Sequence, residues 1–372
     1  MQSTFPFADP VTWLARQMPD EPVMFFAPQR LRDTAARFFN GFPGLVTYAV
    51  KANPREEVLQ NLVGAGVRAF DVASPVEMAA VRAVCPKAVL HYNNPVRSGA
   101  EVQAAREHGV ASWSVDSLDE LEKLRGLGDV EISVRLALPV AGAAYDFGEK
   151  FGAAPDLAVA LLRRVSEMGA RPAMTFHPGT QCANPGAWAA YIRACADIAA
   201  RAGARLERLN VGGGFAAHRG GPAPDLEAIF ARIRTETTLV FGGDAPALVC
   251  EPGRAMVAEA YMLAARVKAR RGAQAVFLND GIYGALAEWR DIAPGDRVQV
   301  FAPDGTPRRG ASCPQVIYGP TCDSIDRLPD PLSLPADMAE GDFVLFSGMG
   351  AYSLALATRF NGYGPSQVVT LA

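Results

Sequence analysis

Histidine and cysteine are scarce in this chain of 372 residues, and neither forms a cluster in the sequence. There are four histidines and six cysteines, and the cysteines lack the paired spacing of metal ligands. They are Cys85, Cys182, Cys195, Cys250, Cys313 and Cys322. We therefore expect no bound metal. Scattered cysteines in a chain of this length are typical of reduced thiols, which indicates a cytoplasmic protein.

A long apolar run and a surplus of positive charge are also missing. No segment reaches the roughly 18 apolar residues that a membrane-spanning helix requires, and the first residues lack the basic and apolar regions of a secretory signal. The chain has 36 basic and 39 acidic side chains, which gives a formal net charge of −3. We therefore expect neither a nucleic acid nor a membrane as a partner.

Apolar strands and amphipathic helices alternate through most of the chain, in which 49% of the residues are hydrophobic and 20% charged. The expected strands are Leu45–Val50, Ala69–Ala73, Ala88–Tyr92, Ala111–Val115, Glu131–Leu136, Ala173–Phe176, Leu206–Val211 and Ala247–Cys250. The expected helices include Pro75–Val84, Val96–Glu107, Leu118–Leu127, Leu157–Met168, Pro185–Ala202 and Leu226–Thr237. The pattern predicts an α/β fold with a closed (β/α)8 TIM barrel, although an open doubly wound sheet would show the same alternation.

Polar residues or glycines follow the eight strands at equivalent positions. They are Lys51, Asp71, Asn93, Asp116, Arg135, His177, the run Gly212–Gly213–Gly214, and Glu251. In a barrel these positions share the carboxyl-terminal rim, where barrel enzymes keep their chemistry. The repeated position therefore favours the closed barrel and predicts an active site on that rim.

The pattern changes after about residue 258 to short strands interrupted by Gly, Pro and Asp. The expected strands are Tyr261–Val267, Ala275–Leu278, Arg297–Phe301, Ser312–Tyr318 and Asp342–Ser347, with a short helix at Leu354–Phe360. We predict a barrel at residues 28–257 and an all-β domain at residues 258–372. The N-terminal segment, residues 1–27, holds the strand Val23–Ala27 and is expected to join the β domain.

Lys51, in Tyr-Ala-Val-Lys-Ala-Asn-Pro, stands beside residues that are expected to be buried. A lysine in a dry setting loses its proton readily or reacts with a carbonyl group. The alternative is an ordinary lysine whose amine reaches solvent from the edge of a strand. The other motifs of the chain decide between these two interpretations.

Several motifs suit an anion. The run Gly212–Gly214 offers backbone N–H groups after a strand, Arg254 in Glu-Pro-Gly-Arg can reach a phosphate or carboxylate, and Thr180 stands in a turn beside His177. The alternatives are a plain flexible turn, a surface pair of Glu251 with Arg254, and a structural histidine.

Two further motifs lie in the expected β domain. Cys322 and Asp323 form a compact pair of thiol and acid, and Tyr352, in Ser-Gly-Met-Gly-Ala-Tyr, offers a phenol beside a glycine turn. An inert cysteine and a tyrosine that packs in the core are the alternatives.

Taken in this order, the motifs resemble the fold type III pyridoxal-phosphate decarboxylases of basic amino acids, above all ornithine/lysine decarboxylase. The resemblance extends over nearly the whole chain. It implies pyridoxal 5′-phosphate as the cofactor and Lys51 as the lysine that forms a Schiff base with it. Glu251 is similar to the glutamate that keeps the pyridine nitrogen protonated, so that the ring accepts the electrons left when CO2 departs.

The resemblance implies roles for the other rim residues. Asp71 is similar to the aspartate near the lysine, His177 to the histidine that stacks on the pyridine ring, and Thr180 to a phosphate-binding serine. The other residues expected at the cofactor are Arg135, Gly212, Gly213, Gly214, Arg254 and Tyr352.

A second group would act on the substrate. Cys322 resembles the thiol that delivers a proton to the carbanion, Asp323 the carboxylate that holds the distal ammonium group, and Phe360 an aromatic residue of that site. In the family these side chains come from the neighbouring subunit, which implies a homodimer with shared active sites. Lys150 and Asp326 would form a salt bridge across its interface.

One segment departs from the family pattern. The family follows Asp-Gly-Val-Tyr-Gly with a run ending in Tyr-Asp-His, whose aspartate also binds the distal amine. Here the sequence after Gly284 reads Ala-Leu-Ala-Glu-Trp-Arg-Asp. Glu288 and Asp291 are the candidates to replace that aspartate. The departure leaves the class of enzyme intact and concerns the substrate.

The expected function is decarboxylation of a basic L-amino acid, ornithine or lysine or a modified relative, with release of CO2 and a diamine. A diaminopimelate decarboxylase would carry Cys-Glu in place of Cys322 and Asp323, and a racemase would use a tyrosine base. A catalytically silent relative that binds regulatory partners is the third alternative. The presence of Lys51, His177 and Glu251 argues against it.

Overall fold

The structure, a computed structural model, describes residues 9–139, 150–272, 274–292 and 295–372. The chain forms two compact units. The barrel unit comprises Thr34–Ala216 and Pro224–Ala255, and the β unit comprises Ala217–Ala223, Met256–Ala372 and the chain up to Asp33. No helix in the described ranges combines the length and apolarity needed to cross a membrane.

The barrel unit contains a parallel sheet that closes on itself. Within the described residues the strands follow one another around it as β2 (Leu45–Val46), β10 (Ala247–Cys250), β9 (Arg208–Asn210), β8 (Arg171–Phe176), β7 (Glu131–Leu136), β6 (Ser112–Val115), β5 (Val89–Tyr92), β4 (Ala69–Val72) and β3 (Tyr48–Ala49). β2 pairs with β10 and β3 pairs with β4, although β2 and β3 are consecutive in the chain. One stretch of chain therefore joins the two ends of the sheet, which confirms the (β/α)8 barrel and excludes the open sheet.

The first barrel strand differs from its prediction. The sequence predicts one strand over Leu45–Val50, whereas the structure breaks it at Thr47, whose N–H and Oγ1 both donate to the carbonyl oxygen of Cys250, at 2.9 and 3.0 Å. The chain then forms a short 3-10 helix, η1 (Val50–Ala52), and Lys51 lies on it. The break follows from closure of the barrel, because this segment pairs with β10 first and with β4 next.

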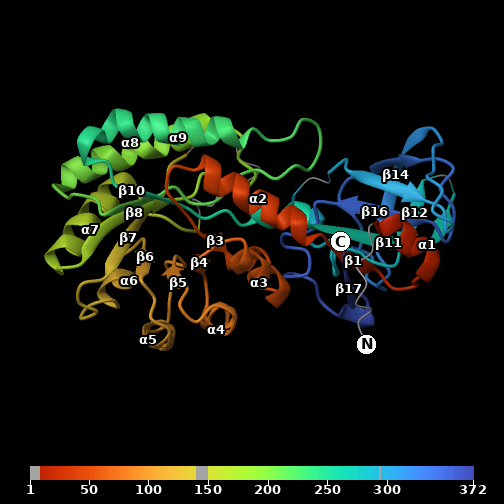
Figure 1. Ribbon diagram of the computed structural model, residues 1–372, viewed down its shortest axis with the longest axis horizontal. Helices are drawn as coiled ribbons and strands as arrows, with labels where there is room; N and C mark the ends of the chain where they lie inside the picture. Colours follow the sequence, from red (N-terminus) through yellow and green to blue (C-terminus); the bar gives the residue numbers. More distant parts are fainter. Residues whose placement is uncertain (1–8, 140–149, 273, 293–294) are drawn as a thin grey trace. The chain divides into compact units, whose positions relative to one another are not determined.

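One helix precedes the first barrel strand, and the others follow the later strands along the chain. They are α2 (Pro28–Gly41), α3 (Glu56–Gly64), α4 (Pro75–Val84), α5 (Gly99–Glu107), α6 (Leu118–Glu122), α7 (Pro155–Glu167), α8 (Pro185–Ala202) and α9 (Leu226–Phe241). In Figure 1, α8 and α9 run side by side along the top of the barrel unit. Ser98 and Glu101 form a capping box that begins α5 at Gly99 rather than at Val96. α6 also ends earlier than predicted.

Aromatic side chains fill the layer between the strands and these helices. Phe215, directly after the glycine run, stacks on Trp188 of α8 with ring centroids 5.1 Å apart and lies 5.9 Å from Phe230 of α9. All three side chains are buried. Their packing anchors the chain where it leaves Gly214 and so fixes the glycine run on the rim.

The β unit is built around the long strand β11 (Tyr261–Arg271). β1 (Val23–Phe26) and β16 (Phe343–Ser347) pair with it antiparallel, so the N-terminal strand lies in the same sheet. The other strands described are β12 (Ala275–Leu278), β13 (Val298–Phe301), β14 (Ser312–Tyr318), β15 (Leu332–Pro335) and β17 (Gln367–Thr370). The sequence did not indicate β15 and β17. The core includes Trp13 of α1 (Pro10–Gln17), which meets Phe25 edge to face at 5.5 Å.

The predicted helix at Leu354–Phe360 is wrong. The segment forms a turn, in which Leu356 and Ala357 donate to the carbonyl of Ser353, and then a 3-10 helix, η4 (Phe360–Gly362). Thr358 N–H and Oγ1 both donate to the carbonyl oxygen of Tyr283, at 2.8 and 3.0 Å. These distant hydrogen bonds compete with helix continuation, which local propensity alone cannot indicate.

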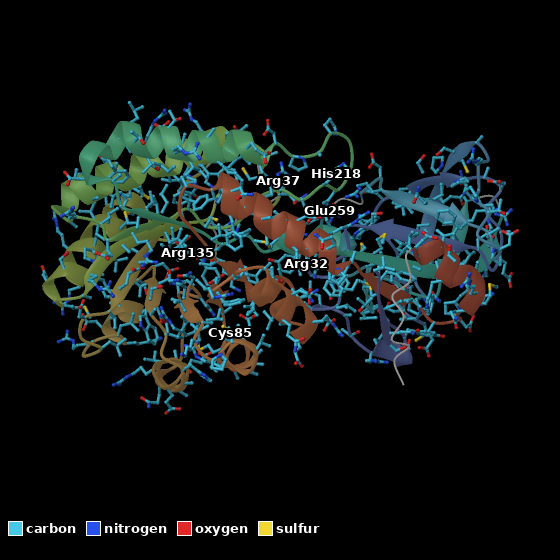
Figure 2. The ribbon with its side chains drawn as sticks, in the orientation of Figure 1. Arg32, Arg37, Cys85, Arg135, His218 and Glu259 are labelled. Atoms are coloured by element: carbon cyan, nitrogen blue, oxygen red, sulfur yellow. The ribbon has the colours of Figure 1, made fainter. Side chains whose placement is uncertain are left out.

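The short segment Ala217–Ala223 belongs to the β unit, although it follows the glycine run of the barrel in sequence. Figure 2 shows His218 of this segment near Glu259. Arg297 joins the two, since its Nη1 donates to the carbonyl oxygen of His218 at 2.8 Å and its Nη2 donates to Glu259 at 3.0 Å. The sequence-based division at residue 258 did not include this segment.

Candidate active site

Five charged or ionisable side chains from separate barrel strands interact at the carboxyl-terminal rim. They are Lys51, Asp71, Arg135, His177 and Glu251, and electrostatic interactions link them. They include cations and acids in a setting that is largely closed to water, where charges interact strongly. The structure therefore brings together the rim residues that the sequence singled out, with Lys51 the exposed member.

Glu251 is 8% exposed and follows β10. Asn93 and Asn210 each donate a side-chain N–H to the same oxygen, Oε1. Burial, together with the nearby Asp71, raises the pKa of Glu251 to about 8, while the bond from Asn210 and the charges of Lys51 and Arg135 oppose that rise. The carboxyl group is therefore poised to gain or lose a proton near neutral pH.

Asp71 is 5% exposed and shares this setting. Burial raises its pKa, and the opposing influences are the charge of Lys51, hydrogen bonds from Asn93 and the charge of Arg135. Asp71 and Glu251 thus both interact with the side-chain amide of Asn93 and with the positive charges of Lys51 and Arg135. Like charges at such a site favour a shared proton over two full charges.

Arg135 is the half-buried cation of the rim. Figure 2 shows its side chain among the barrel strands, and its guanidinium lies over the ring of Phe151 at 5.1 Å. Burial lowers its pKa, whereas the acids Glu251, Asp116 and Asp71 raise it. Asp116 itself accepts a hydrogen bond from the N–H of Gly152 at 2.9 Å.

His177 is held as a neutral imidazole. Burial first, and then the cations Lys51 and Arg135, lower the pKa of His177 well below its ordinary value. Its Nδ1 accepts a hydrogen bond from the N–H of Gly179 at 3.1 Å, so the proton of the neutral ring resides on Nε2. An uncharged flat ring suits stacking against another aromatic ring.

The glycine run has no room for side chains. A Cβ on Gly212 would lie 2.0 Å from the carbonyl oxygen of Phe176, and one on Gly214 would lie 2.3 Å from that of Gly179. Both glycines have positive φ angles, +70° and +79°. Backbone rather than side chain therefore borders the rim here, as at other phosphate sites.

Thr180 and Arg254 complete the polar groups near this run. The Arg254 Nη2 donates to Thr180 Oγ1 at 3.5 Å, and both residues are buried. The turn that carries Thr180 also carries Gly179, whose carbonyl oxygen lies against Gly214. A hydroxyl, a guanidinium and a glycine-rich backbone are the groups that bind a phosphate monoester in many sites. The residues present therefore fit a phosphorylated aromatic aldehyde whose amine partner is Lys51.

The β unit gathers a second set of predicted residues in the Cys322 loop, Gly319–Asp326. The Tyr283 hydroxyl donates to Asp323 Oδ2 at 2.5 Å, and the ring of Tyr283 lies 4.9 Å from that of Phe360. The Cys322 N–H donates to Asn361 Oδ1 at 3.0 Å, and the cysteine is exposed. Cys322, Asp323 and Phe360 are thus neighbours within one unit.

Three other predicted residues have different surroundings in the β unit. Glu288 is buried and forms a salt bridge of 3.0 Å with Arg219, and Asp291 pairs with Arg290 at 2.8 Å on the surface. Tyr352 is half-buried and has a positive φ of 55°. Glu288 and Asp291 are thus each paired with an arginine.

Asp326 has a role within its own loop. Its Oδ1 accepts from the Ile282 N–H at 3.0 Å, and its Oδ2 accepts from the N–H and the hydroxyl of Thr321 at 3.1 and 2.7 Å. The side chain is 2% exposed. This carboxylate therefore holds the Cys322 loop against the segment that carries Tyr283.

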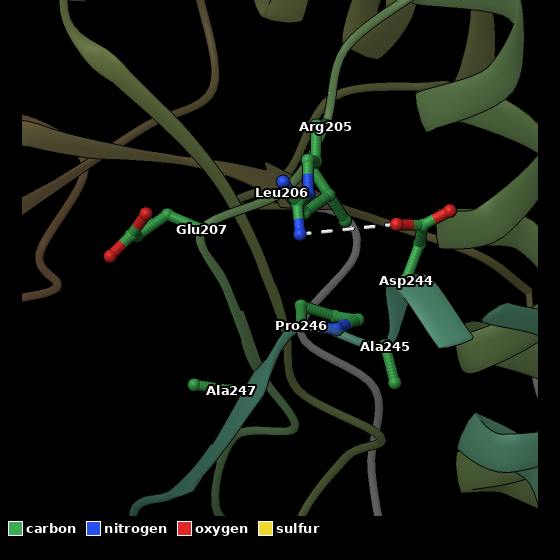
Figure 3. A pocket seen from close by; sticks show the side chains of 7 residues that line it. All are labelled: Arg205, Leu206, Glu207, Asp244, Ala245, Pro246 and Ala247. Carbon is green, nitrogen blue, oxygen red and sulfur yellow. Dashed lines mark ion pairs between the residues drawn. The ribbon is translucent and has the colours of Figure 1, made fainter. Parts of the chain in front are cut away.

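A hollow at the opposite end of the barrel does not belong to this site. It has a volume of about 290 Å³ and lies where the chain enters β9 and β10, before those strands begin. Figure 3 shows Arg205 and Asp244 facing each other across it, 3.9 Å apart. Both side chains are more than four-fifths exposed, and this end of a barrel serves stability rather than chemistry.

The model of the family described as pyridoxal-dependent decarboxylase, pyridoxal binding domain, matches residues 29–258. The chain belongs to this family. The decarboxylase is 32% identical to Decarboxylase flvG of Aspergillus flavus, over 85% of this chain and 77% of that protein. It is also 32% identical to the lysine/ornithine decarboxylase of Selenomonas ruminantium, over 86% of this chain and 81% of that one.

Solved structures agree with this assignment. The lysine/ornithine decarboxylase of Vibrio vulnificus in complex with putrescine is 28% identical, with a TM-score of 0.82 over 97% of both chains. The arginine decarboxylase of Paramecium bursaria Chlorella virus is 25% identical, with a TM-score of 0.86 over 97% of this chain and 98% of that one. The protein is thus a fold type III decarboxylase of the ornithine/lysine decarboxylase type, and its cofactor is pyridoxal 5′-phosphate.

Three residues of these clusters carried no role in the sequence interpretation. Asn93 follows a predicted strand, Asn210 precedes the glycine run, and Tyr283 lies in Asp-Gly-Ile-Tyr-Gly. The common position of Asn93 after a barrel strand was the available signal. Nothing local in the sequence pairs Asn210 with Glu251 or Tyr283 with Asp323, because those contacts span about 40 residues.

Proposed function

We propose that this decarboxylase removes the α-carboxyl group of a basic L-amino acid, ornithine or lysine or a modified relative, and releases CO2 and a diamine. The observation that carries the proposal is the buried rim cluster around Glu251, which suits a protonated pyridine ring. Relatives named as lysine/ornithine and arginine decarboxylases support a basic substrate. When bound, pyridoxal phosphate accepts the electrons that remain on Cα as CO2 leaves.

The rim residues hold and tune the cofactor in this proposal. Lys51 would anchor its aldehyde carbon covalently, and Asp71 steadies the lysine by charge. Glu251 would hold the ring nitrogen, and the neutral His177 would stack on the ring. The phosphate would be bound by Thr180, Arg254 and the run Gly212–Gly214, and Arg135 and Tyr352 stay predicted as further residues of the cofactor site.

The Cys322 loop acts on the substrate. Cys322 delivers a proton to Cα, and Asp323 binds the distal ammonium group. Hydrogen bonds from Tyr283 and from the Ile325 N–H lower the pKa of Asp323, so its carboxylate is charged at neutral pH and attracts a cation. Phe360, 42% exposed, borders the same group of residues.

Asp323 has more support as the distal-group ligand than either other carboxylate. Glu288 is buried against Arg219, and Asp291 is engaged by Arg290. Each therefore already has a cationic partner within its own chain. That Glu288 or Asp291 takes the place of the family's second aspartate stays a prediction, which substrate profiles can test.

The proposed assembly is a homodimer in which the Cys322 loop completes the partner's site. Large apolar side chains stand exposed around this loop, and such patches mark surfaces that bind another protein. They are Ile325, Leu356, Phe360 and Tyr363, with exposed fractions of 63%, 49%, 42% and 37%. The predicted salt bridge of Lys150 with Asp326 has weaker support, because the Asp326 carboxylate is buried and accepts hydrogen bonds in its own chain.

A decarboxylation screen tests the proposed function. The protein, saturated with pyridoxal phosphate, would be given ornithine, lysine, arginine, diaminopimelate and N-substituted or hydroxylated analogues, and CO2 release would be measured. We expect turnover of at least one basic amino acid. Ornithine and lysine should differ modestly, since one methylene is worth only about 1–3 kcal/mol of discrimination. Turnover of diaminopimelate alone, or of none of these compounds, would contradict the proposal.

A further inference from the structure

Two amide side chains converge on one oxygen of Glu251. Asn93 lies after β5 and Asn210 ends β9, so they reach the carboxylate from different strands of the barrel. Both donate through Nδ2, and both donate to Oε1. Asn93, Asn210 and Glu251 are 9%, 6% and 8% exposed, so this contact is made away from bulk water.

The amide of Asn210 is fixed in orientation. Its Oδ1 accepts a hydrogen bond from the N–H of Gly212 at 2.9 Å, and the N–H of Glu251 donates to the carbonyl oxygen of Gly212 at the same distance. The acceptor end of the amide is therefore committed to the glycine run. Its donor end can only face the carboxylate, so the direction of the hydrogen bond is set by the backbone.

Asn93 contacts both acids of the rim. Its side chain donates to Glu251, and its hydrogen bonds oppose the rise that burial causes in the pKa of Asp71. A neutral donor between two buried carboxylates lowers the cost of placing them close together without adding a charge. The two acids therefore share a donor that does not compete with Lys51.

We propose that Asn93 and Asn210 are positioning residues that aim Glu251 at the ring nitrogen of the cofactor. By donating to Oε1 they favour the charged carboxylate and leave Oε2 as the oxygen that meets the ring N–H. The proposal rests on the proposed pairing of Glu251 with that nitrogen. In this proposal, two uncharged side chains that do not touch the reacting atoms help to keep the ring nitrogen protonated, because they orient Glu251.

The test compares two ligands that differ at one ring atom. The full-length protein, freed of cofactor, would be titrated with pyridoxal phosphate and with its analogue in which C–H replaces the ring nitrogen, and the two affinities measured by absorbance. The ratio of these affinities reports the contact at the nitrogen, since the aldehyde and phosphate contacts are common to both. The variants are Asn93→Ala and Asn210→Asp, and the second keeps the acceptor for Gly212 while removing the donor.

We expect the wild type to favour pyridoxal phosphate and each variant to lose at least about tenfold of that preference, the scale of one hydrogen bond to a charged group. Asn94→Ala is the matched control, because Asn94 is the next residue and its Nδ2 donates instead to the carbonyl oxygen of Ala73, at 3.4 Å. Its preference should equal that of the wild type. The analogue should bind all four proteins with similar affinity.

Other results would overturn the proposal. A preference retained in both Asn93→Ala and Asn210→Asp would show that the amides do not act on the nitrogen contact. Equal losses of affinity for both ligands would indicate a purely structural role. A wild type that binds neither ligand would instead contradict the proposed function, so the two failures are distinguishable.

Discussion

The rim of the barrel unit and the Cys322 loop of the β unit present functional groups in opposite ways. On the rim, Asp71 and Glu251 are buried and are held by amides and cations of the same unit. On the loop, Cys322 is exposed and Phe360 is 42% exposed beside other apolar side chains. The two acids of the rim thus have their partners within one unit, whereas the loop displays its side chains on a surface.

This difference has a chemical consequence. Burial moves pKa values strongly, so the rim can hold a carboxyl near neutrality and a histidine without charge. Asp323, close to solvent, keeps a charged carboxylate through hydrogen bonds alone. The rim is therefore suited to control the protonation of a bound cofactor. The Cys322 loop is suited to bind a cation and to deliver a proton once another protein surface covers the loop. The following predictions test this division.

Replacing Lys51 should have the largest effect. Lys51→Ala removes the only proposed covalent anchor and also one of the cations beside Asp71 and Glu251. We expect loss of decarboxylation and of the visible absorbance of the lysine-bound cofactor, measured by CO2 release and spectroscopy. Lys87→Ala, which changes a lysine with no assigned role, is the control. Near-normal turnover by Lys51→Ala would show that the rim is not the catalytic centre.

Replacing Cys322 should leave cofactor binding unchanged and should impair product formation. Cys322→Ala leaves the rim unchanged, so its affinity for pyridoxal phosphate should equal that of the wild type. Loss of a proton donor should slow turnover by about 10²–10⁴-fold or divert the product. Cys85→Ala is a matched control on another cysteine. An unaffected rate and product profile would place the proton donor elsewhere.

Mixing these two variants tests whether the loop serves a partner. In a dimer with shared sites, a Lys51→Ala chain paired with a Cys322→Ala chain has one site without either change. Mixed and re-equilibrated subunits should therefore recover about a quarter of the wild-type rate, because half of the dimers are mixed and each has one intact site. No recovery, despite mixed dimers detected by mass, would indicate sites made within a single chain.

The smallest expected effect is on stability and its pH dependence. The folded-state pKa of Glu251 is about 8 and its ordinary value is 4.5, so the folded cofactor-free protein keeps a proton that the unfolded chain releases. The stability that this bound proton contributes is complete below the ordinary pKa of 4.5 and is lost as the pH rises to about 8, at up to roughly 1 kcal/mol per pH unit. Glu251→Gln should show a flatter free energy of unfolding between about pH 5 and 8, measured with urea. Parallel curves for the two proteins would contradict the raised pKa.

Sequence reasoning reached the barrel and the rim residues because both follow from a repeated pattern. Strands that alternate with helices place residues such as Lys51 and Glu251 at equivalent positions, and closure brings those positions to one edge. It failed at Leu354–Phe360, where Thr358 bonds to the distant Tyr283 carbonyl instead of continuing a helix. It also left Glu288 open as a substrate ligand, because its partner Arg219 lies 69 residues away.

The sequence by itself determined the class of fold, the order of the motifs and the identity of the groups that can react. Tertiary structure decided which of those groups meet: that Asn93 and Asn210 hold one oxygen of Glu251, and that Lys51 lies on a 3-10 turn. The physical reason is the distance along the chain over which each kind of interaction acts. Periodicity and turn chemistry act over a few residues, whereas burial and the pKa of a carboxyl depend on side chains that chain closure brings from strands far apart in sequence.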